Sequence, residues 1–212
     1  MWSPKLSWSL VVIGILGRLG TNAEADDGLP SMGFSSFLPV QATLRHEAIV
    51  GDEQIRRTYV TVGTNLFAFC VPPGFQLDAS NPAKVVLTPA DYKCFLVFRV
   101  RARDLEGVAK SYRDTVLEEY PDAKILSEFA QPAGTSGGEA FDLQWVSTGH
   151  IIQSARVVFV ESSVGTVELI LLASADNFAG SKRALDYLRF SYCSDKDGPI
   201  KPLQTPSEPP RS

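Results

Sequence analysis

The stretch Leu66-Phe67-Ala68-Phe69-Cys70-Val71-Pro72-Pro73-Gly74-Phe75 decides which folds are open to this chain. Its first six residues are apolar and of strand length, and they follow a short turn, Gly63-Thr64-Asn65. The strand-like run Glu53–Val62 lies on the other side of that turn, so the two runs predict a hairpin. Pro72 and Pro73 have no N–H group to donate to a sheet. We therefore expect the chain to leave the sheet at these two prolines.

Most of the chain beyond this point alternates with a period of two, as strands do. In Tyr92–Arg101, both sets of alternating residues are apolar at the centre of the run, which is typical of a sheet covered on both faces. The segment Ser162–Thr166 joins two strand-like runs in a second predicted hairpin. The further runs of strand length are Lys84–Leu87, Lys124–Phe129, Glu139–Ser147, Ile151–Ser162 and Val167–Ala173.

Two segments have helical spacing instead. Apolar residues recur every three or four positions over Leu105–Tyr120, with Asp104 as the expected N-cap and Pro121 as the stop. A second helix is expected to begin at Ser174 or Asp176 and to run to about Tyr187. The order strands, helix, strands, helix, with short links between strands, predicts an α+β fold. We expect one antiparallel β-sheet with helices packed on both faces.

The ordered set of these motifs resembles a known family, the PsbP-like fold. The extrinsic photosystem II protein shares this fold with a Ran-binding nuclear factor and many small exported bacterial proteins. The resemblance covers about residues 58–193 and implies an α/β/α sandwich that binds or stabilises partners. No metal-retention site of the photosynthetic members can be matched to residues here. The resemblance to the PsbP-like fold rests on five motifs, in this order: Leu66–Phe75, the helix Leu105–Tyr120, Gly138-Glu139-Ala140-Phe141, the hairpin around Gly165 and Leu188-Arg189-Phe190-Ser191-Tyr192.

The N-terminus has the pattern of a secretory signal peptide. Lys5 precedes the apolar run Leu6–Leu16, which is too short to span a bilayer. The small residues of Ala23-Glu24-Ala25 then favour cleavage by signal peptidase after Ala25, and cleavage after Ala23 is the alternative. The other interpretation is an uncleaved membrane anchor. We predict a periplasmic or secreted protein. Its expected parts are a signal peptide 1–25, an arm or linker 26–57 with room for one strand, one domain 58–193, and a disordered Pro-rich tail 194–212.

Composition excludes several classes of function. The 212-residue chain has 24 acidic and 20 basic residues, so we expect no nucleic-acid partner. With two histidines and three cysteines, we expect no metal or cofactor. His46 and His150 each lack a spaced partner, and we interpret both as turn or surface residues. Outside the signal, the longest apolar stretch is only of strand length, so no membrane span is expected.

The cysteines leave two interpretations open. In an oxidising compartment, two of Cys70, Cys94 and Cys193 could pair. A bridge between the first two would stabilise the fold by about 3 kcal/mol in the chain-entropy model. The other interpretation is three small buried apolar residues. The sequence does not choose between them.

One motif imitates a catalytic site. The segment Gly134-Thr135-Ser136-Gly137-Gly138 satisfies G-x-S-x-G, and Asp142 and His150 follow in the order of an α/β-hydrolase triad. A nucleophile elbow needs a helix after the serine, but here the following residues alternate as a strand. We therefore interpret this segment as a flexible hairpin loop.

Charged residues form two local groups. Arg99, Arg101 and Arg103 alternate at the end of a strand and point to one side. They could meet an anionic partner, but pairing with acids of the covering helix is the expected outcome. Glu118, Glu119 and Asp122 form an acidic group at the end of that helix, which we interpret as solvated surface.

These observations predict an exported, non-catalytic accessory or binding protein with an unknown protein partner or small ligand. No catalytic, cofactor-binding or metal-binding residue is predicted. Two alternatives remain. The first is a small serine hydrolase that uses Ser136. The second is a carrier of a small apolar ligand in a pocket lined by Phe67, Phe69 and Phe98, which we interpret first as core residues.

Overall fold

A computed structural model describes residues 36–48, 54–103, 111–147, 149–195 and 198–200 of the chain. The predicted signal peptide, the first part of the arm and residues 201–212 of the tail lie outside the described residues. Every strand pairing between the named strands is antiparallel. The predicted α+β class with an antiparallel sheet is therefore confirmed.

The strands form two sheets, so the expectation of one sheet is wrong. The small sheet has four strands in the order β1 (Gln41–Ala48), β2 (Gln54–Val62), β3 (Asn65–Cys70) and β11 (Cys193–Ser194). The large sheet has seven strands in the order β4-β5-β6-β10-β9-β8-β7. Its strands are β4 (Phe75–Asp78), β5 (Val85–Pro89), β6 (Cys94–Ala102), β7 (Lys124–Ala130), β8 (Gly138–Val146), β9 (Ile152–Glu161) and β10 (Gly165–Ser174).

The turn at Pro72–Phe75 is the point where the chain passes from one sheet to the other. Phe75 N donates to Pro72 O at 3.1 Å, and Gly74 has φ +78°. These features, with Pro73 before the glycine, define a type II turn, in which only glycine adopts the third position without strain. The prolines end β3 in the small sheet, and β4 begins at Phe75 in the large one. The predicted exit from the sheet is thus confirmed as a change of sheet.

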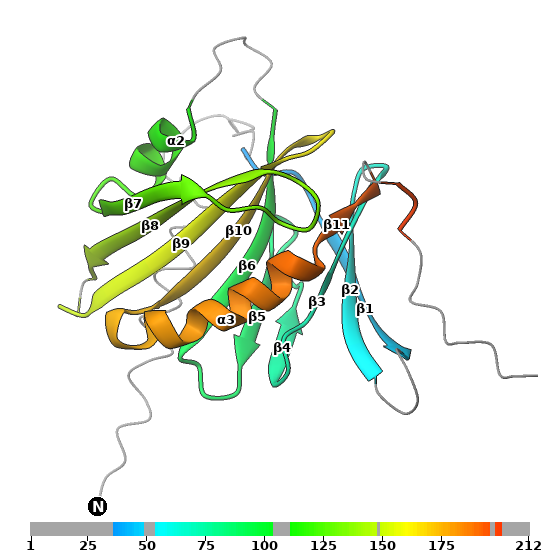
Figure 1. Ribbon diagram of the computed structural model, residues 1–212, viewed down its shortest axis with the longest axis horizontal. Helices are drawn as coiled ribbons and strands as arrows, with labels where there is room; N and C mark the ends of the chain where they lie inside the picture. Colours follow the sequence, from blue (N-terminus) through cyan, green and yellow to red (C-terminus); the bar gives the residue numbers. More distant parts are fainter. Residues whose placement is uncertain (1–35, 49–53, 104–110, 148, 196–197, 201–212) are drawn as a thin grey trace, which may run out of the picture.

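Helix α3 (Ala175–Ser191) lies across the large sheet and leads directly into β11 (Figure 1). It contacts β10, β6 and β9 of the large sheet and β3 of the small sheet. Ser174 is its N-cap, as one of the two predictions had it, and the helix continues four residues past the predicted end at Tyr187. Its buried residues Leu185 and Leu188 belong to the main apolar cluster, and because α3 contacts both sheets, it packs them against each other.

Helix α2 (Tyr112–Glu119) lies within the C-terminal part of the predicted helix Leu105–Tyr120. Its N-cap is Ser111. The predicted N-cap Asp104 and residues 105–110 lie outside the described part of the chain. The hydroxyl of Ser111 accepts from Asp114 N at 3.1 Å and satisfies one of the free N–H groups of the first turn. The residues at which the helical spacing begins lie in this undescribed segment, so the predicted start of the helix stays a prediction.

The core is split between the two faces of the large sheet. Leu169 and Leu171 of β10 belong to the main apolar cluster, which α3 and the inner face of the small sheet complete. Ile170 and Leu172 alternate with them and belong to a second cluster with Val116 of α2. We call these the first and second faces of the large sheet. None of the described helices is long and apolar enough to cross a membrane.

Candidate functional site

The densest group of charged side chains lies on the second face of the large sheet. Arg99 and Arg101 are two residues apart on β6, so both side chains leave the sheet on this face. Glu168 of β10 lies opposite Arg99 in register. Arg99 Nε donates to Glu168 Oε2 at 2.6 Å, and Arg101 Nε donates to Glu168 Oε1 at 2.7 Å. One carboxylate is thus held between two guanidinium groups.

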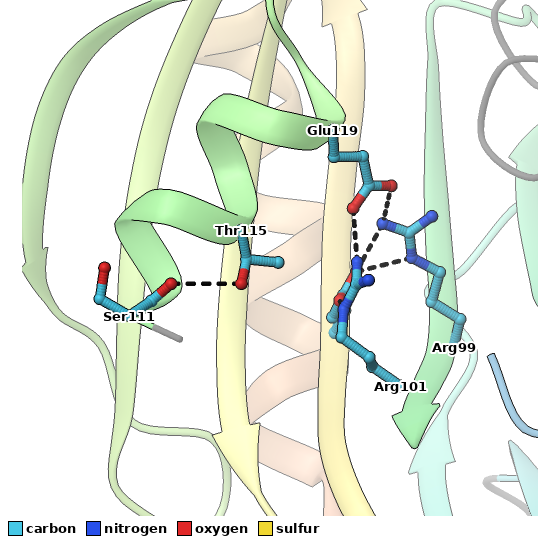
Figure 2. Close-up of polar contacts among 6 residues, drawn as sticks. Arg99, Arg101, Ser111, Thr115 and Glu119 are labelled. Atoms are coloured by element: carbon cyan, nitrogen blue, oxygen red, sulfur yellow. Dashed lines mark hydrogen bonds and ion pairs between the residues drawn. The ribbon is translucent and has the colours of Figure 1, made fainter. Parts of the chain in front are cut away.

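A second carboxylate comes from the last residue of α2. Figure 2 shows Glu119 reaching from the helix toward both arginines. Arg101 Nη2 donates to Glu119 Oε2 at 2.6 Å, and Arg99 Nη2 donates to Glu119 Oε1. The predicted pairing of the arginine stripe with acids of the covering helix is confirmed for these two residues. We call Arg99, Arg101, Glu119 and Glu168 the large-sheet cluster.

The N-terminal arm closes this cluster. The guanidinium carbon of Arg99 lies 4.1 Å from the centre of the Phe37 ring, and that of Arg101 lies 4.6 Å from it. Phe37 forms a bridge with Arg101 of β6, so its position is fixed by the backbone as well. An aromatic ring at this distance attracts a cation through its negative face. Both guanidinium groups therefore have carboxylates and an aromatic ring as partners.

Burial sets the electrostatics of the large-sheet cluster. The side chains of Arg99 and Glu168 are 1% and 0% exposed. Burial disfavours the charged form of Arg99, but the carboxylates of Glu168 and Glu119 outweigh it and raise its pKa. Two negative charges compensate two positive ones, and each carboxylate is bound by two arginines. The cluster therefore offers neither a free base nor an uncompensated anion site, and it acts to join β6, β10 and α2.

The third arginine of the stripe and the acidic group have other surroundings. Arg103 Nη2 donates to the carbonyl oxygen of Ser162 at 3.3 Å, in the turn before β10. Of the acidic residues, Glu119 belongs to the large-sheet cluster, whereas Glu118 and Asp122 are exposed. The interpretation of the acidic group as surface is thus wrong for Glu119, whose side chain is only 15% exposed.

A second group of charged residues lies on the small sheet. Tyr59 donates its hydroxyl hydrogen to Glu47, and Arg57 Nη1 lies 3.7 Å from Glu47 Oε2. Arg57 Nη2 also donates to the thiol sulfur of Cys193 at 2.9 Å. Burial and the hydrogen bond to Glu47 raise the pKa of Tyr59, which stays protonated at neutral pH. We call Glu47, Arg57, Tyr59 and Cys193 the small-sheet cluster; it joins β1 and β2 to β11.

The structure does not bring the imitated catalytic triad together. Ser136 precedes β8 and His150 follows it, so the nine-residue strand separates them by roughly 27 Å. Asp142 lies in the middle of the strand, where Arg156 Nε and Nη2 donate to its two oxygens at 2.7 and 2.8 Å. Ser136 forms a tight turn in which its N–H donates to Ala133 O at 3.0 Å. This geometry agrees with the interpretation of the segment as a hairpin loop.

The phenylalanines proposed for a ligand pocket fill the core. Phe67, Phe69 and Phe98 are at most 1% exposed. The ring of Phe98 lies 5.8 Å from that of Phe67 and 5.4 Å from that of Phe69, between ring centres. Rings at these separations pack against one another. The interpretation of these residues as core is therefore confirmed.

The three cysteines are free thiols. Cys193 of β11 lies opposite Ala68 of β3, and Cys70 is two residues beyond Ala68 on β3. Cys94 is buried in the main apolar cluster. Burial raises the pKa of Cys70 and of Cys94, which keeps both thiols protonated and unreactive. His46 is exposed on β1, and His150 is exposed in the β8–β9 turn. No group of three or more His, Cys, Asp or Glu residues in the described parts of the chain could hold a metal ion.

Comparison with known proteins finds similarity at the level of structure. No family model and no curated protein sequence matches the chain. A solved structure of LpqN from Mycobacterium tuberculosis, described as involved in cell envelope biogenesis, has 15% identity and a TM-score of 0.44, and covers 73% of this chain and 91% of its own. A protein of unknown function from Pseudomonas aeruginosa has 12% identity and a TM-score of 0.36, with 79% and 91% covered.

The third structure is the solution structure of cyanobacterial PsbP from Synechocystis sp. PCC 6803. It has 12% identity and a TM-score of 0.38, and the match covers 78% of this chain and 96% of that one. A PsbP is thus among the structures similar to this chain. The resemblance stated from the sequence motifs has this counterpart among solved structures.

Sequence reasoning missed two members of this site, Glu168 and Phe37. Glu168 is the one charged residue in the apolar run Val167–Ala173, and Arg99 stands likewise in an apolar strand. Charges in buried strands need partners, so this pair of exceptions could have identified the contact. Phe37 gave no such signal, because its segment has no period.

Proposed function

We propose that the protein is an exported, non-catalytic accessory protein that acts by binding a partner. One observation carries the proposal: the reactive side chains of the imitated triad lie at opposite ends and in the middle of β8, and Asp142 is bound by Arg156. The charged clusters are likewise compensated internally. For the fold we infer the layering predicted above, with a helix against each face of the large sheet, supported by Leu185 of α3 and Val116 of α2.

Labelling with a fluorophosphonate probe tests the non-catalytic part of the proposal. We expect the wild-type protein to stay unlabelled, as will the Ser136→Ala variant, which serves as the matched control. Labelling of the wild type that disappears in Ser136→Ala would establish a serine hydrolase and overturn the proposal. A known serine hydrolase added to the same sample verifies that the probe is active.

Site-specific photocrosslinking tests the binding part. Phe190 is 68% exposed on α3, and Leu117 is 44% exposed on α2, so a photoreactive amino acid fits at either position without disturbing the core. Expressed in its native host, the protein is expected to give one crosslinked species of defined mass from one position and not from the other. Equal and diffuse crosslinking from both positions, or none, contradicts a specific partner.

Export is tested by the mass of the protein recovered from the envelope fraction. We expect a chain that begins at Asp26, or at Glu24 for the alternative cleavage. A full-length chain retained in the cell interior would contradict export. The same measurement without reducing agent reports on the thiols, since each disulfide lowers the mass by two hydrogens.

A further inference from the structure

One part of the edge of β6 is occupied by a segment from outside the large sheet. On one side, β10 pairs with β6 along its whole length, from Cys94 to Ala102. On the other side, β5 pairs only with residues 96–98. Residues 99–102 of β6 therefore extend beyond β5, and their outward backbone groups need another partner.

The N-terminal arm supplies that partner. Leu38 N donates to Val100 O at 2.8 Å, and Ala102 N donates to Ser36 O at 2.9 Å. Two residues later, Val40 N donates to Pro82 O at 2.7 Å, just before β5. These are the hydrogen bonds of a short antiparallel strand added to the edge of a sheet. Many proteins bind extended peptides by adding them to a sheet edge in this way.

The side chains of the arm alternate between the two faces of the large sheet. Phe37 lies over the guanidinium groups of Arg99 and Arg101 on the second face. Leu38 packs against the main apolar cluster on the first face, and Val40 is buried in that cluster. An aromatic residue followed by aliphatic ones is thus recognised by two different surfaces, one cationic and one apolar.

We propose that residues 99–102 of β6 form a recognition site for an extended peptide with an aromatic residue followed by an aliphatic one, and that Phe37–Val40 is the segment resident in it. The competing partner is an extended segment of another protein with the same pattern. This inference rests on the proposed binding function and adds to it the site and the class of partner. The surface that meets the aromatic ring is held in a fixed geometry, because Arg99 is 1% exposed and its guanidinium group is bound by Glu168 and Glu119.

The resident segment has a large advantage over any competitor. Because it is part of the same chain, its effective concentration at the site is in the millimolar range. A peptide added to the wild-type protein is therefore expected to bind weakly. Weakening the resident segment should open the site, and this is the effect that an experiment can isolate.

The test uses the full chain and a fluorescent peptide with the sequence of residues 36–40. Phe37→Ala removes the ring from the resident segment, and we expect it to bind the peptide about tenfold more tightly than the wild type does, measured by fluorescence anisotropy. A peptide with alanine in place of phenylalanine should gain no such affinity. Phe190→Ala, which removes an exposed aromatic ring elsewhere, is the control and should bind as the wild type does.

Two further variants keep the test decisive. Phe37→Leu preserves an apolar side chain and removes only the aromatic face, so it replaces Phe37→Ala should that variant fail to fold. Adding Arg101→Gln to either variant should abolish the gain in affinity, because one of the two cations is lost. Amide exchange of Leu38 and Ala102 should quicken in Phe37→Ala, reporting release of the arm.

The proposal is overturned if Phe37→Ala binds the peptide no more tightly than the wild type, or binds the phenylalanine and alanine peptides equally. That outcome would make the arm a purely structural element. It would leave the accessory role itself to the crosslinking experiment, since a partner captured through another surface does not depend on this edge.

Discussion

The two charged clusters use the same chemistry in different ways. In the large-sheet cluster, two arginines and two glutamates compensate one another, and the hydrogen bonds at Glu168 are 2.6 and 2.7 Å long. In the small-sheet cluster, the carboxylate of Glu47 accepts from a tyrosine hydroxyl and pairs with an arginine, and Arg57 Nη1 lies 3.7 Å from Glu47 Oε2. The first joins the adjacent inner strands β6 and β10 to α2, and the second joins the edge strand β1 and its neighbour β2 to β11.

The difference shows what a buried charge does in each sheet. Arg99 and Glu168 lie on β6 and β10, two adjacent inner strands of the large sheet, where water cannot replace a lost partner. Removing one member of such a pair leaves the other buried and uncompensated. Glu47 and Arg57 are nearly as buried, at 6% and 10%, but β1 is an edge strand that can move away from β2. We therefore expect the large-sheet cluster to matter more for stability.

The largest expected effect follows from breaking the large-sheet cluster. Glu168→Gln removes the carboxylate that both arginines share, and we expect the free energy of unfolding to fall by about 3 kcal/mol. Urea-induced unfolding followed by circular dichroism measures this change. A loss below about 1 kcal/mol would show that Glu119 alone compensates Arg99, and the contrast between the clusters would then disappear.

A smaller loss is expected from the small-sheet cluster. Glu47→Gln keeps the size of the side chain but removes the charge next to Arg57, and it replaces the carboxylate acceptor of the Tyr59 hydroxyl by a neutral amide oxygen, which accepts a weaker hydrogen bond. We expect a loss of about 1.5 kcal/mol in the same unfolding measurement. If this variant is as unstable as Glu168→Gln, position in the sheet is not what decides the cost of a lost partner.

Asp142, which pairs with Arg156 and Lys182 outside both clusters, allows the contribution of a buried ion pair to be measured by changing the pH. Burial opposes ionisation, but the hydrogen bonds and charge of Arg156, with Lys182, outweigh it and lower the pKa of Asp142 from 3.8. A lowered pKa in the folded state means that Asp142 stabilises the fold above its unfolded pKa. This contribution, about 1 kcal/mol, is lost as the pH falls through the folded value.

The Asp142→Asn variant should accordingly be less stable than the wild type at neutral pH and should differ from it less and less below about pH 4. Thermal melts across this range measure the difference. A constant difference at every pH would mean that the charge of Asp142 contributes nothing and that its shape alone matters.

The smallest effect is expected at an exposed pair. Arg113 Nη1 lies 2.7 Å from Glu128 Oε2, but the two side chains are 55% and 41% exposed. Arg113→Ala should cost at most about 0.5 kcal/mol, and added salt should reduce even that. A cost near that of Glu47→Gln would show that burial does not decide how much a charged pair contributes to stability.

Much of the fold could be predicted from local pattern. Period-two runs located β2, β3, β6 and β10 within a few residues, and the proline pair marked the exit from the small sheet. The presence of a second sheet could not be predicted this way. Which strands do not pair decides it, and its last strand, β11, has two residues and pairs with β3 across more than a hundred residues of sequence; no local period encodes such a contact.

The candidate site was predictable only in part, for a related reason. The alternation of Arg99 and Arg101 fixed their common direction, and their pairing with the helix followed from charge alone. The N-cap of α2 depends on one hydrogen bond at Ser111, which a periodic pattern does not reveal. Phe37 reaches the cluster through backbone bonds of an aperiodic segment, so tertiary structure alone places it there.

The small sheet takes its two outer strands from the two ends of the described chain, β1 from residues 41–48 and β11 from residues 193–194. A growing chain therefore carries β3 with an open edge until residues 193–194 have been synthesised. Ribosome-bound intermediates should lack the final hydrogen bonds of β3 until residue 194 has emerged. Closing of this edge is thus a late step of folding, because it waits for residues more than a hundred positions downstream of β3.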